Sequence, residues 1–378
     1  MTELPRHTNP VQELAATVAA PFESARTMPP SVYTSELFLK REMDMIFARE
    51  WVCVGRSDGL ANPGDYTTME IAGQPIMVVR RADGTLAAQS NVCLHRMSTM
   101  LEGEGNTSTI VCPYHAWTYG LDGQLRGAPA MGRNTAFDRK ENCLPQLRCT
   151  EWLGWLLVSL NPDVPDPSEN LSDLEELIAP FGMETYRQTF REHHHWNTNW
   201  KVLAENFMES YHLPVCHAGT IGGFVDLEEM DCPPSGANWN YHSILKDPDA
   251  PLTNAHPTNT SLTGDLRRTT VLFTVYPSLL VTLTPGYFWY LSLLPDGPDH
   301  VKIIYGGGLS PDYVNDPKAQ EHFAQLKELL DRVNDEDRGC TEAVYRGLCS
   351  PMATPGHLSH LERPLYDFAT WINDRVQR

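Results

Sequence analysis

The sequence lacks any long apolar run. Its 378 residues include no stretch of about 18 consecutive apolar residues, the length that a membrane-spanning helix needs. The N-terminal stretch also lacks the basic segment followed by an apolar segment that marks a secretory leader. We therefore expect neither a membrane partner nor export, and we predict a cytoplasmic protein.

Basic residues are scarce as well. Lysine and arginine total 29 against 48 aspartate and glutamate residues, which gives a formal net charge of −19. Such a chain repels nucleic acids and anionic membranes, so we expect no nucleic-acid partner. The same charge mildly favours cationic ligands.

Two further patterns are missing. The sequence contains no G-x-G-x-x-G fingerprint, so we expect that the chain does not itself bind NAD or a flavin. Its nine cysteines do not follow the spacing of a disulfide framework, which fits a reducing compartment.

Two short cysteine and histidine motifs are present. Cys93-x-His95 and Cys112-x-x-His115 supply two thiolates and two imidazoles. A zinc finger usually supplies two cysteines and then two histidines, whereas here each motif gives one cysteine and then one histidine. This order favours a Rieske [2Fe–2S] cluster, in which two cysteines bind one iron and two histidines bind the other, over structural zinc. A chain that carries such a cluster and no nucleotide fingerprint needs a separate reductase as its electron donor.

The residues around these motifs resemble a known family. NVCLHR and CPYHAWTYGLDGQL are similar to the Rieske domain of the Rieske non-haem iron oxygenases, large-subunit type. One difference is Ala116, where that family commonly has glycine, and we expect its methyl group to fit. Trp117 and Tyr119 are available to shield the cluster from water.

Length and strand-like patterns predict an α+β protein of two domains. Residues 47–161 are expected to form a small all-β Rieske domain, and residues 162–378, which begin with a linker rich in proline and acids, a larger catalytic domain with an antiparallel sheet flanked by helices. Residues 1–46 form an N-terminal helical segment that we expect to pack on the catalytic domain. Helices are expected at 35–51 and 171–181, and catalytic-domain strands at 269–276, 279–284, 287–294 and 301–306.

The segment NWKVLAENFMESYHLPVCH indicates a second metal site. A helix is expected from about Asn199 to a break at Pro214, with Glu209 and His212 three residues apart on one face. His217 follows the break and can fold back beside His212. Two neutral imidazoles and one carboxylate make the facial triad that binds ferrous iron and leaves positions open for dioxygen.

The carboxylate of this triad is expected further along the chain, on an apolar stripe with helical spacing. A carboxylate on an apolar face is costly unless it is paired or binds a metal, so Asp337 is the predicted third ligand. Glu336, at the edge of the same stripe, is the alternative. The stripe consists of Leu326, Leu330, Val333, Asp337, Cys340, Val344 and Gly347.

The family named above has a similar iron site. Its pattern E-N-x-x-E-x-Y-H-x-x-x-x-H, followed by N-x-E-D, matches this sequence from Glu205 to His217 and from Asn334 to Asp337. The resemblance implies that His212, His217 and Asp337 bind a mononuclear Fe(II), and that the substrates are O2 and a small molecule.

The resemblance also implies roles for Asn206 and Glu209 in the catalytic site. Glu209 would be the carboxylate that bridges the Rieske histidine of one subunit, His95 or His115, to His212 of its neighbour. Such a head-to-tail contact closes a ring of three subunits, so a homotrimer is expected.

Glu209 is also the main clue to the substrate. Ring-hydroxylating dioxygenases usually carry aspartate at this position, whereas the branch that acts on carnitine, choline or glycine betaine often carries glutamate. We therefore predict a monooxygenase that hydroxylates or N-dealkylates a small quaternary ammonium compound, with aromatic residues available for a cation–π cage. One alternative is hydroxylation or demethylation of an aromatic acid bound by Arg267 or Arg268, and another is an electron carrier that uses the cluster alone.

Other residues near these motifs receive simpler interpretations. The histidines at 193–195 are expected in an extended segment without a metal role. Cys216 is expected to be a small buried residue rather than a thiolate ligand. The aromatic run at 287–290 is expected to be a strand packed on both faces.

Overall fold

The computed structural model describes residues 9–224, 227, 230, 232–246 and 252–378. The chain folds into two units. One is Phe47–Pro165, and the other joins the described residues before Phe47 to Asp166–Arg378. The smaller unit is built from strands and the larger one from a sheet with helices, so the predicted α+β class is confirmed.

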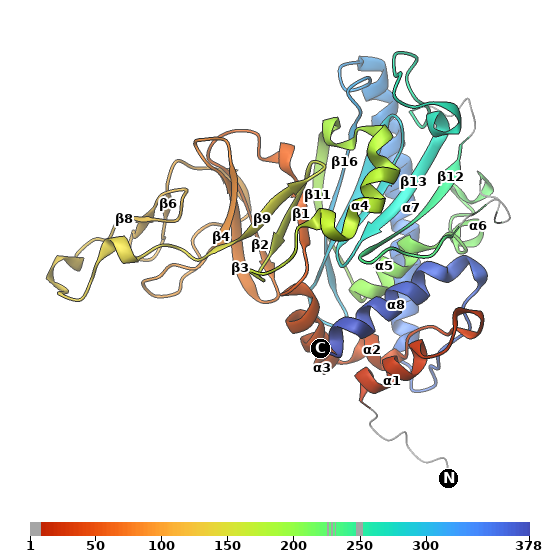
Figure 1. Cartoon of the computed structure of the whole chain (residues 1–378), viewed down its shortest axis with the longest axis horizontal. Helices are drawn as coiled ribbons and strands as arrows, with labels where there is room; N and C mark the ends of the chain where they lie inside the picture. The colour runs from red at the N-terminus through yellow and green to blue at the C-terminus, as the bar shows by residue number, and fades with distance from the viewer. Residues whose placement is uncertain (1–8, 225–226, 228–229, 231, 247–251) are drawn as a thin grey trace, which may run out of the picture. The chain divides into compact units, whose positions relative to one another are not determined.

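The smaller unit (orange to yellow in Figure 1) contains two antiparallel sheets. A seven-stranded sheet has the order β1-β10-β9-β4-β3-β2-β5, and a three-stranded sheet has the order β6-β7-β8. The strands are β1 Val52–Arg56, β2 Asp65–Ile71, β3 Gln74–Arg80, β4 Leu86–Ser90, β5 Glu104–Asn106, β6 Ile110–Val111, β7 Thr118–Tyr119, β8 Leu125–Gly127, β9 Gln146–Trp152 and β10 Trp155–Ser159.

Two hairpins of this unit close through two-residue loops that end in glycine. Ala72 and Gly73 join β2 to β3 with φ values of 47° and 76°, and Leu153 and Gly154 join β9 to β10 with 47° and 83°. Positive φ at both loop residues is the geometry of a type I′ turn, whose twist matches that of the flanking strands. These turns fix the register of the sheet.

The core of the smaller unit surrounds the two cysteine motifs. Cys93 and Cys112 belong to one cluster of buried residues in which apolar side chains from the two sheets meet. The cluster consists of Met77, Val79, Ala87, Cys93, Met100, Ile110, Cys112, Trp117, Tyr119, Leu125 and Leu144.

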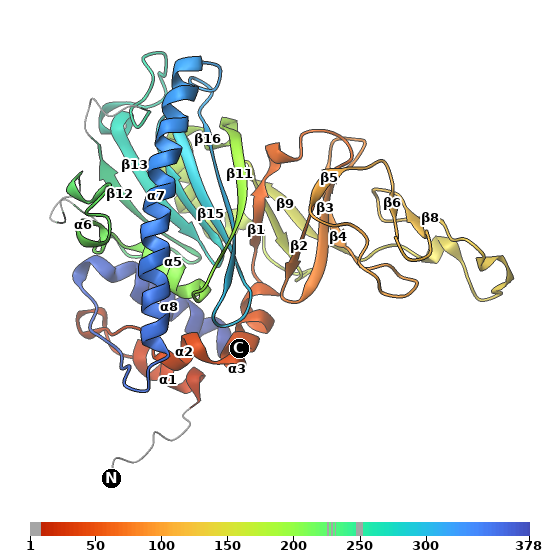
Figure 2. The ribbon, with the colours of Figure 1, turned by 180° about the vertical axis from the view of Figure 1, so that it is seen from behind.

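The larger unit contains a six-stranded antiparallel sheet in the order β11-β16-β15-β14-β13-β12. Helix α7 runs along one face of this sheet (Figure 2), and helix α4 lies on the other (Figure 1). The strands are β11 Arg187–Trp196, β12 Trp239–Leu245, β13 Thr269–Val275, β14 Leu279–Leu283, β15 Tyr287–Pro295 and β16 Val301–Leu309. The helices are α1 Pro10–Val18, α2 Pro30–Thr34, α3 Glu36–Glu42, α4 Pro167–Ile178, α5 Trp200–Met208, α6 Leu213–Cys216, α7 Pro317–Leu348 and α8 Arg363–Val376.

The N-terminal helices pack on this larger unit. The N–H of Thr27 donates to the carbonyl of Gly356, and the N–H of Leu358 donates to the carbonyl of Ala25, both at 3.1 Å. Helix α1 packs against α8. The N-terminal segment is therefore part of the fold that carries the second metal motif.

Three elements differ from the expectation. The helix expected over 35–51 ends earlier, because α3 passes into one π-helical turn at Met43–Phe47 before β1 begins. Strand β12 was not expected. On α7 the apolar stripe is buried at Val333 but exposed at Val344, where the described residues do not cover the helix.

Within the described part of the chain, none of the helices combines the length and the apolar character that crossing a bilayer requires.

Candidate metal centres

Cys93 and Cys112 begin two loops with the same hydrogen-bond pattern. In each loop the N–H four residues after the cysteine donates to the cysteine carbonyl at 3.0 Å, and the cysteine N–H donates to the carbonyl five residues on, at 2.9 and 2.8 Å. The residues at the fourth position, Met97 and Ala116, have left-handed backbone conformations with φ values of 56° and 57°. This conformation is the physical reason for a glycine at position 116 in the family, and alanine adopts it at a cost of about 1 kcal/mol.

The two loops bring their histidines together. The rings of His95 and His115 lie edge to face with centroids 4.6 Å apart, and Trp117 stacks on His95 at 4.8 Å. The thiol of Cys93 is buried and lies 3.4 Å from the hydroxyl of Tyr119, whereas His115 is exposed. Two buried free thiols beside one half-buried and one exposed imidazole fit the donor set that a Rieske cluster requires, so these four side chains would hold the cluster and it would supply single electrons.

The second motif begins where α5 ends. Helix α5 stops at Met208, and Glu209 is extended with φ −131° and ψ 159°. Its carboxylate accepts hydrogen bonds from the N–H groups of Tyr211 and His212, which a continuing helix would have used for its own carbonyls. The expectation that Glu209 and His212 share a helix face is therefore wrong. Pro214 does not end that helix either, because it lies in the first turn of the separate helix α6.

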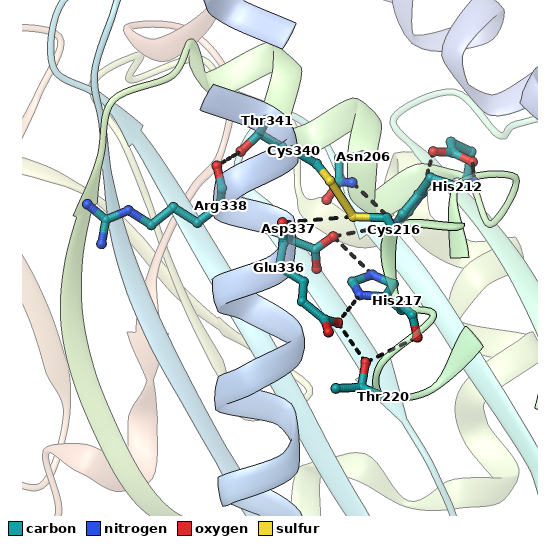
Figure 3. Close-up of a disulfide and its surroundings, with 11 residues drawn as sticks. Asn206, His212, Cys216, His217, Thr220, Glu336, Asp337, Arg338, Cys340 and Thr341 are labelled. Atoms are coloured by element: carbon teal, nitrogen blue, oxygen red, sulfur yellow. Dashed lines mark hydrogen bonds and ion pairs between the residues drawn. A yellow bond between two sulfur atoms is a disulfide. The ribbon is translucent and has the colours of Figure 1, made fainter. Parts of the chain in front are cut away.

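His212, His217 and Asp337 converge from the two ends of α6 and from α7. His212 precedes α6, His217 follows it, and Asp337 lies on α7 (Figure 3). One ligand atom from each residue can be chosen so that all three atoms lie within 4.8 Å of one another. The Nε2 atoms of His217 and His212 lie 3.1 and 3.5 Å from Oδ1 of Asp337.

The atoms at the centre of this group fit a metal ion. Nε2 of His217 and Oδ1 of Asp337 are buried and make no hydrogen bond, although they face each other. Buried polar atoms without a partner are rare, and a bound cation would satisfy both. Two imidazole nitrogens and one carboxylate oxygen with further positions open suit ferrous iron.

Two more carboxylates hold the far sides of the imidazoles. Nδ1 of His212 lies 2.5 Å from Glu209, and Nδ1 of His217 lies 2.8 Å from Oε2 of Glu336, which also accepts a 2.6 Å hydrogen bond from the hydroxyl of Thr220. Each imidazole can therefore donate its Nδ1 proton to a carboxylate and direct Nε2 towards a metal. This geometry favours Asp337 over Glu336 as the third ligand.

The carboxylates of Asp337 and Glu209 govern the charge of His212 in the metal-free chain. Burial lowers the pKa of His212, but the adjacent carboxylates of Asp337 and Glu209 outweigh it and raise the pKa to about 9. A metal ion must therefore displace a proton from this ring when it binds.

Two polar side chains complete the surroundings. Nδ2 of Asn206 lies 3.3 Å from Nε2 of His212, so the structure brings this expected site residue next to the triad. Sequence reasoning missed His242 on β12, whose Nε2 lies 3.0 Å from the hydroxyl of Ser210. Both side chains are buried, and burial followed by the charge of His212 lowers the pKa of His242 to about 4. A single histidine within a strand carries no sequence signal that could have identified it.

The interpretation of Cys216 is wrong. Cys216 is only half-buried, and its sulfur forms a disulfide with Cys340 of α7, 124 residues further on (Figure 3). The spacing of the nine cysteines did not reveal this pair.

The three histidines at 193–195 remain outside the triad. They lie on β11, where His194 contacts Glu192 at 3.1 Å and His195 contacts Asp296 at 3.0 Å. Their expected lack of a metal role stays a prediction.

A cluster that delivers single electrons and an iron that can bind dioxygen are the components of a Rieske oxygenase. The comparisons with known proteins agree. Residues 50–148 match the Rieske [2Fe–2S] domain, and residues 183–378 match the catalytic domain of the ring-hydroxylating alpha subunit. The chain belongs to the ring-hydroxylating alpha-subunit family, and its cofactors are a Rieske [2Fe–2S] cluster and a mononuclear iron.

Several named proteins are similar to this chain over most of its length. The oxygenase subunit of carnitine monooxygenase from Acinetobacter baumannii is 27% identical over 90% of this chain and 90% of its own. Chloroplastic choline monooxygenase from Arabidopsis thaliana is 29% identical over 94% of this chain and 84% of its own. A solved quaternary ammonium Rieske monooxygenase, described with carnitine oxidation and inter-subunit electron transfer, has the same fold, with a TM-score of 0.79, 23% identity and 99% of each chain covered.

Proposed function

We propose that this chain is the oxygenase component of a cytoplasmic monooxygenase that acts on a small quaternary ammonium compound. The observation that carries the proposal is the similarity, over nine-tenths of the chain, to carnitine and choline monooxygenases. Carnitine and choline share a trimethylammonium group. The excess of acidic residues in this chain is compatible with a cationic substrate.

In this proposal the cluster is held by Cys93, His95, Cys112 and His115, and the iron by His212, His217 and Asp337. Three observations support these assignments: the buried thiols, the paired imidazole rings, and the buried atoms of His217 and Asp337 that make no hydrogen bond. When bound, the cluster supplies electrons and the iron supplies a site for dioxygen.

The reaction that we propose inserts one oxygen atom into a C–H bond beside the quaternary nitrogen. The substrate, O2, two electrons and two protons then give the hydroxylated substrate and one water molecule. Hydroxylation at a carbon bound to the nitrogen gives an unstable product whose C–N bond breaks, with loss of formaldehyde or of an amine. The electrons come from a separate reductase.

Glu209 is the proposed link between subunits. Its carboxylate already contacts Nδ1 of His212, and in a homotrimer the same carboxylate would also accept a hydrogen bond from the imidazole of His95 or His115 of the neighbouring subunit. The inter-subunit electron transfer described for a protein of the same fold supports this arrangement.

The aromatic-acid alternative loses its main support. It required a free arginine to bind the substrate carboxylate, but Arg267 and Arg268 are both engaged with the protein. Arg267 donates to the carbonyls of Ala255, His256, Asn259 and Leu262, and Arg268 donates to that of Lys246 and lies 3.5 Å from Asp265.

The test is oxygen uptake by the purified chain with a partner reductase and NADH, measured for carnitine, choline, glycine betaine and a set of aromatic acids. We expect uptake matched by product formation for at least one quaternary ammonium compound. The Asp337→Ala variant, which lacks the proposed anionic ligand, is the negative control. Coupled turnover of an aromatic acid with none of the quaternary compounds would contradict the proposal.

A further inference from the structure

The disulfide joins two helices, α6 and α7, and each of its cysteines lies within one turn of a proposed iron ligand. Cys216 ends α6 immediately before His217, and Cys340 lies on α7 one turn after Asp337 (Figure 3). The sulfur of Cys216 also lies 3.8 Å from the carbonyl of Glu336, the residue whose carboxylate holds His217. A bond between these two sulfurs therefore links the two segments of the chain that carry His217 and Asp337.

This pair differs from the other cysteines of the chain. The remaining seven form no disulfide, and Cys93 and Cys112, the proposed cluster ligands, are buried. Cys340 is exposed and Cys216 is half-buried, so small oxidants and reductants can reach them. In the cytoplasm proposed above, thiols are kept reduced, so an accessible disulfide is expected to open and close there.

We propose that Cys216 and Cys340 are a reversible modification site, a dithiol that hydrogen peroxide oxidises to the disulfide and that a dithiol reductant restores. One thiolate attacks a peroxide oxygen, forming a sulfenic acid as the O–O bond breaks and one water leaves. The second thiol then attacks this sulfur and releases a second water. The two thiols lose two electrons and two protons, and peroxide gains them as it becomes two water molecules.

Oxidation retains iron in the triad. For iron to leave, His217 and Asp337 must move apart. With reduced sulfurs, Glu336 on α7 contacts the segment after α6 through His217 and Thr220. The covalent bond keeps the ligands close after these contacts open, so a lost ligand rebinds before the ion escapes. This consequence rests on the proposed role of His217 and Asp337 as iron ligands, whereas the oxidation itself does not.

The first measurement detects the bond. The full-length protein with both metal centres is treated with hydrogen peroxide, blocked with N-ethylmaleimide and digested, and the linked Cys216–Cys340 peptide is measured by mass spectrometry before and after dithiothreitol. We expect the linked peptide to form and then to disappear on reduction. The Cys340→Ser variant should lack it, and Cys349→Ser, which removes an exposed free cysteine, should form it as the wild type does.

The second measurement follows the release of the mononuclear iron. The protein is treated with ascorbate, which keeps this iron ferrous, and a ferrous chelator captures the iron that leaves. The absorbance of the cluster shows whether the cluster keeps its own iron. Oxidised wild type should release its mononuclear iron about tenfold or more slowly than reduced wild type, since the linked ligands remain at high effective concentration. Cys340→Ser should release it at the fast rate under both conditions. Equal rates in the two wild-type states, or a peptide that forms no link or cannot be reduced, would overturn the inference. Absence of mononuclear iron with a normal linked peptide would instead count against the proposed function.

Discussion

His217 directs Nε2 at Oδ1 of Asp337 across 3.1 Å, and these two buried atoms make no hydrogen bond. We propose both as metal ligands, because a cation bound between them would satisfy two buried polar atoms that otherwise make no hydrogen bond. Around it, Glu336 and Glu209 hold the outer nitrogens of the two imidazoles.

Replacement of Asp337 by alanine is expected to empty the iron site and to leave the Rieske cluster intact, because the triad loses its anionic ligand. Glu336→Ala should keep iron at saturation but bind it about 10- to 100-fold more weakly, since His217 loses the carboxylate that orients it. Iron analysis with electron paramagnetic resonance of the reduced cluster measures both effects. Asp335→Ala, at an exposed neighbouring position, is the matched control. If only the Glu336 variant lost its iron, Glu336 and not Asp337 would be the third iron ligand.

Glu209→Gln is expected to keep both metal centres and the trimer but to lose about 10- to 100-fold in turnover, because the amide cannot accept both imidazole protons. Tyr211→Phe, at the exposed position two residues on, should turn over normally.

A mixture of Glu209→Gln with Cys112→Ser, which should show no Rieske resonance, regains activity if an intact cluster in one subunit serves an intact iron site in the next. Confirmed mixed trimers without recovery would show that electrons stay within one chain.

We expect the free energy of unfolding to depend on pH because His242 is buried. The pKa of His242 falls to about 4 on folding from an unfolded value of about 6.5, so the unfolded chain binds more protons between these pH values. The contribution of His242 to the free energy of unfolding is complete above about pH 6.5 and is lost as the pH falls through 4. At pH 5 the loss, relative to neutral pH, is about 2 kcal/mol. His242→Gln removes this dependence. Urea unfolding of the wild type and of His242→Gln at pH 7.5 and 5 measures this dependence, and His360→Gln, at an exposed position, is the control. An equal loss of unfolding free energy in the wild type and in His242→Gln would contradict the prediction.

Glu42→Gln is expected to destabilise the chain by about 3–5 kcal/mol, because it leaves the ammonium of Lys201 buried without its counter-charge. Both side chains of this pair are completely buried, and they connect α3 to α5 at 2.8 Å. Asp44→Asn removes the partner of Lys40 in an exposed pair and should cost less than about 1 kcal/mol. Thermal or urea unfolding compares the two variants, and equal costs would show that the buried pair has no special role.

Local sequence patterns predicted the features that depend on neighbouring residues. The strands β13 to β16 follow runs of apolar residues, and the two cysteine loops are short motifs whose geometry is set within six residues. The end of α5 was missed because it depends on a competition that spacing does not reveal, in which the side chain of Glu209 takes the N–H groups of the next turn. The contact of His242 with Ser210 and the bond between Cys216 and Cys340 arise only when distant segments fold together, so no local pattern contains them.

Glu336 and Asp337 are consecutive residues of one helix, yet they hold opposite nitrogens of the same imidazole, that of His217. A half-turn of this ring about its Cβ–Cγ bond would break both contacts at once, so the ring has one favoured orientation even in the metal-free chain. An arriving ion therefore meets a ligand that is already aligned. The rate of metal uptake at His217 should then depend on how fast the ion sheds its water, not on how fast the protein rearranges.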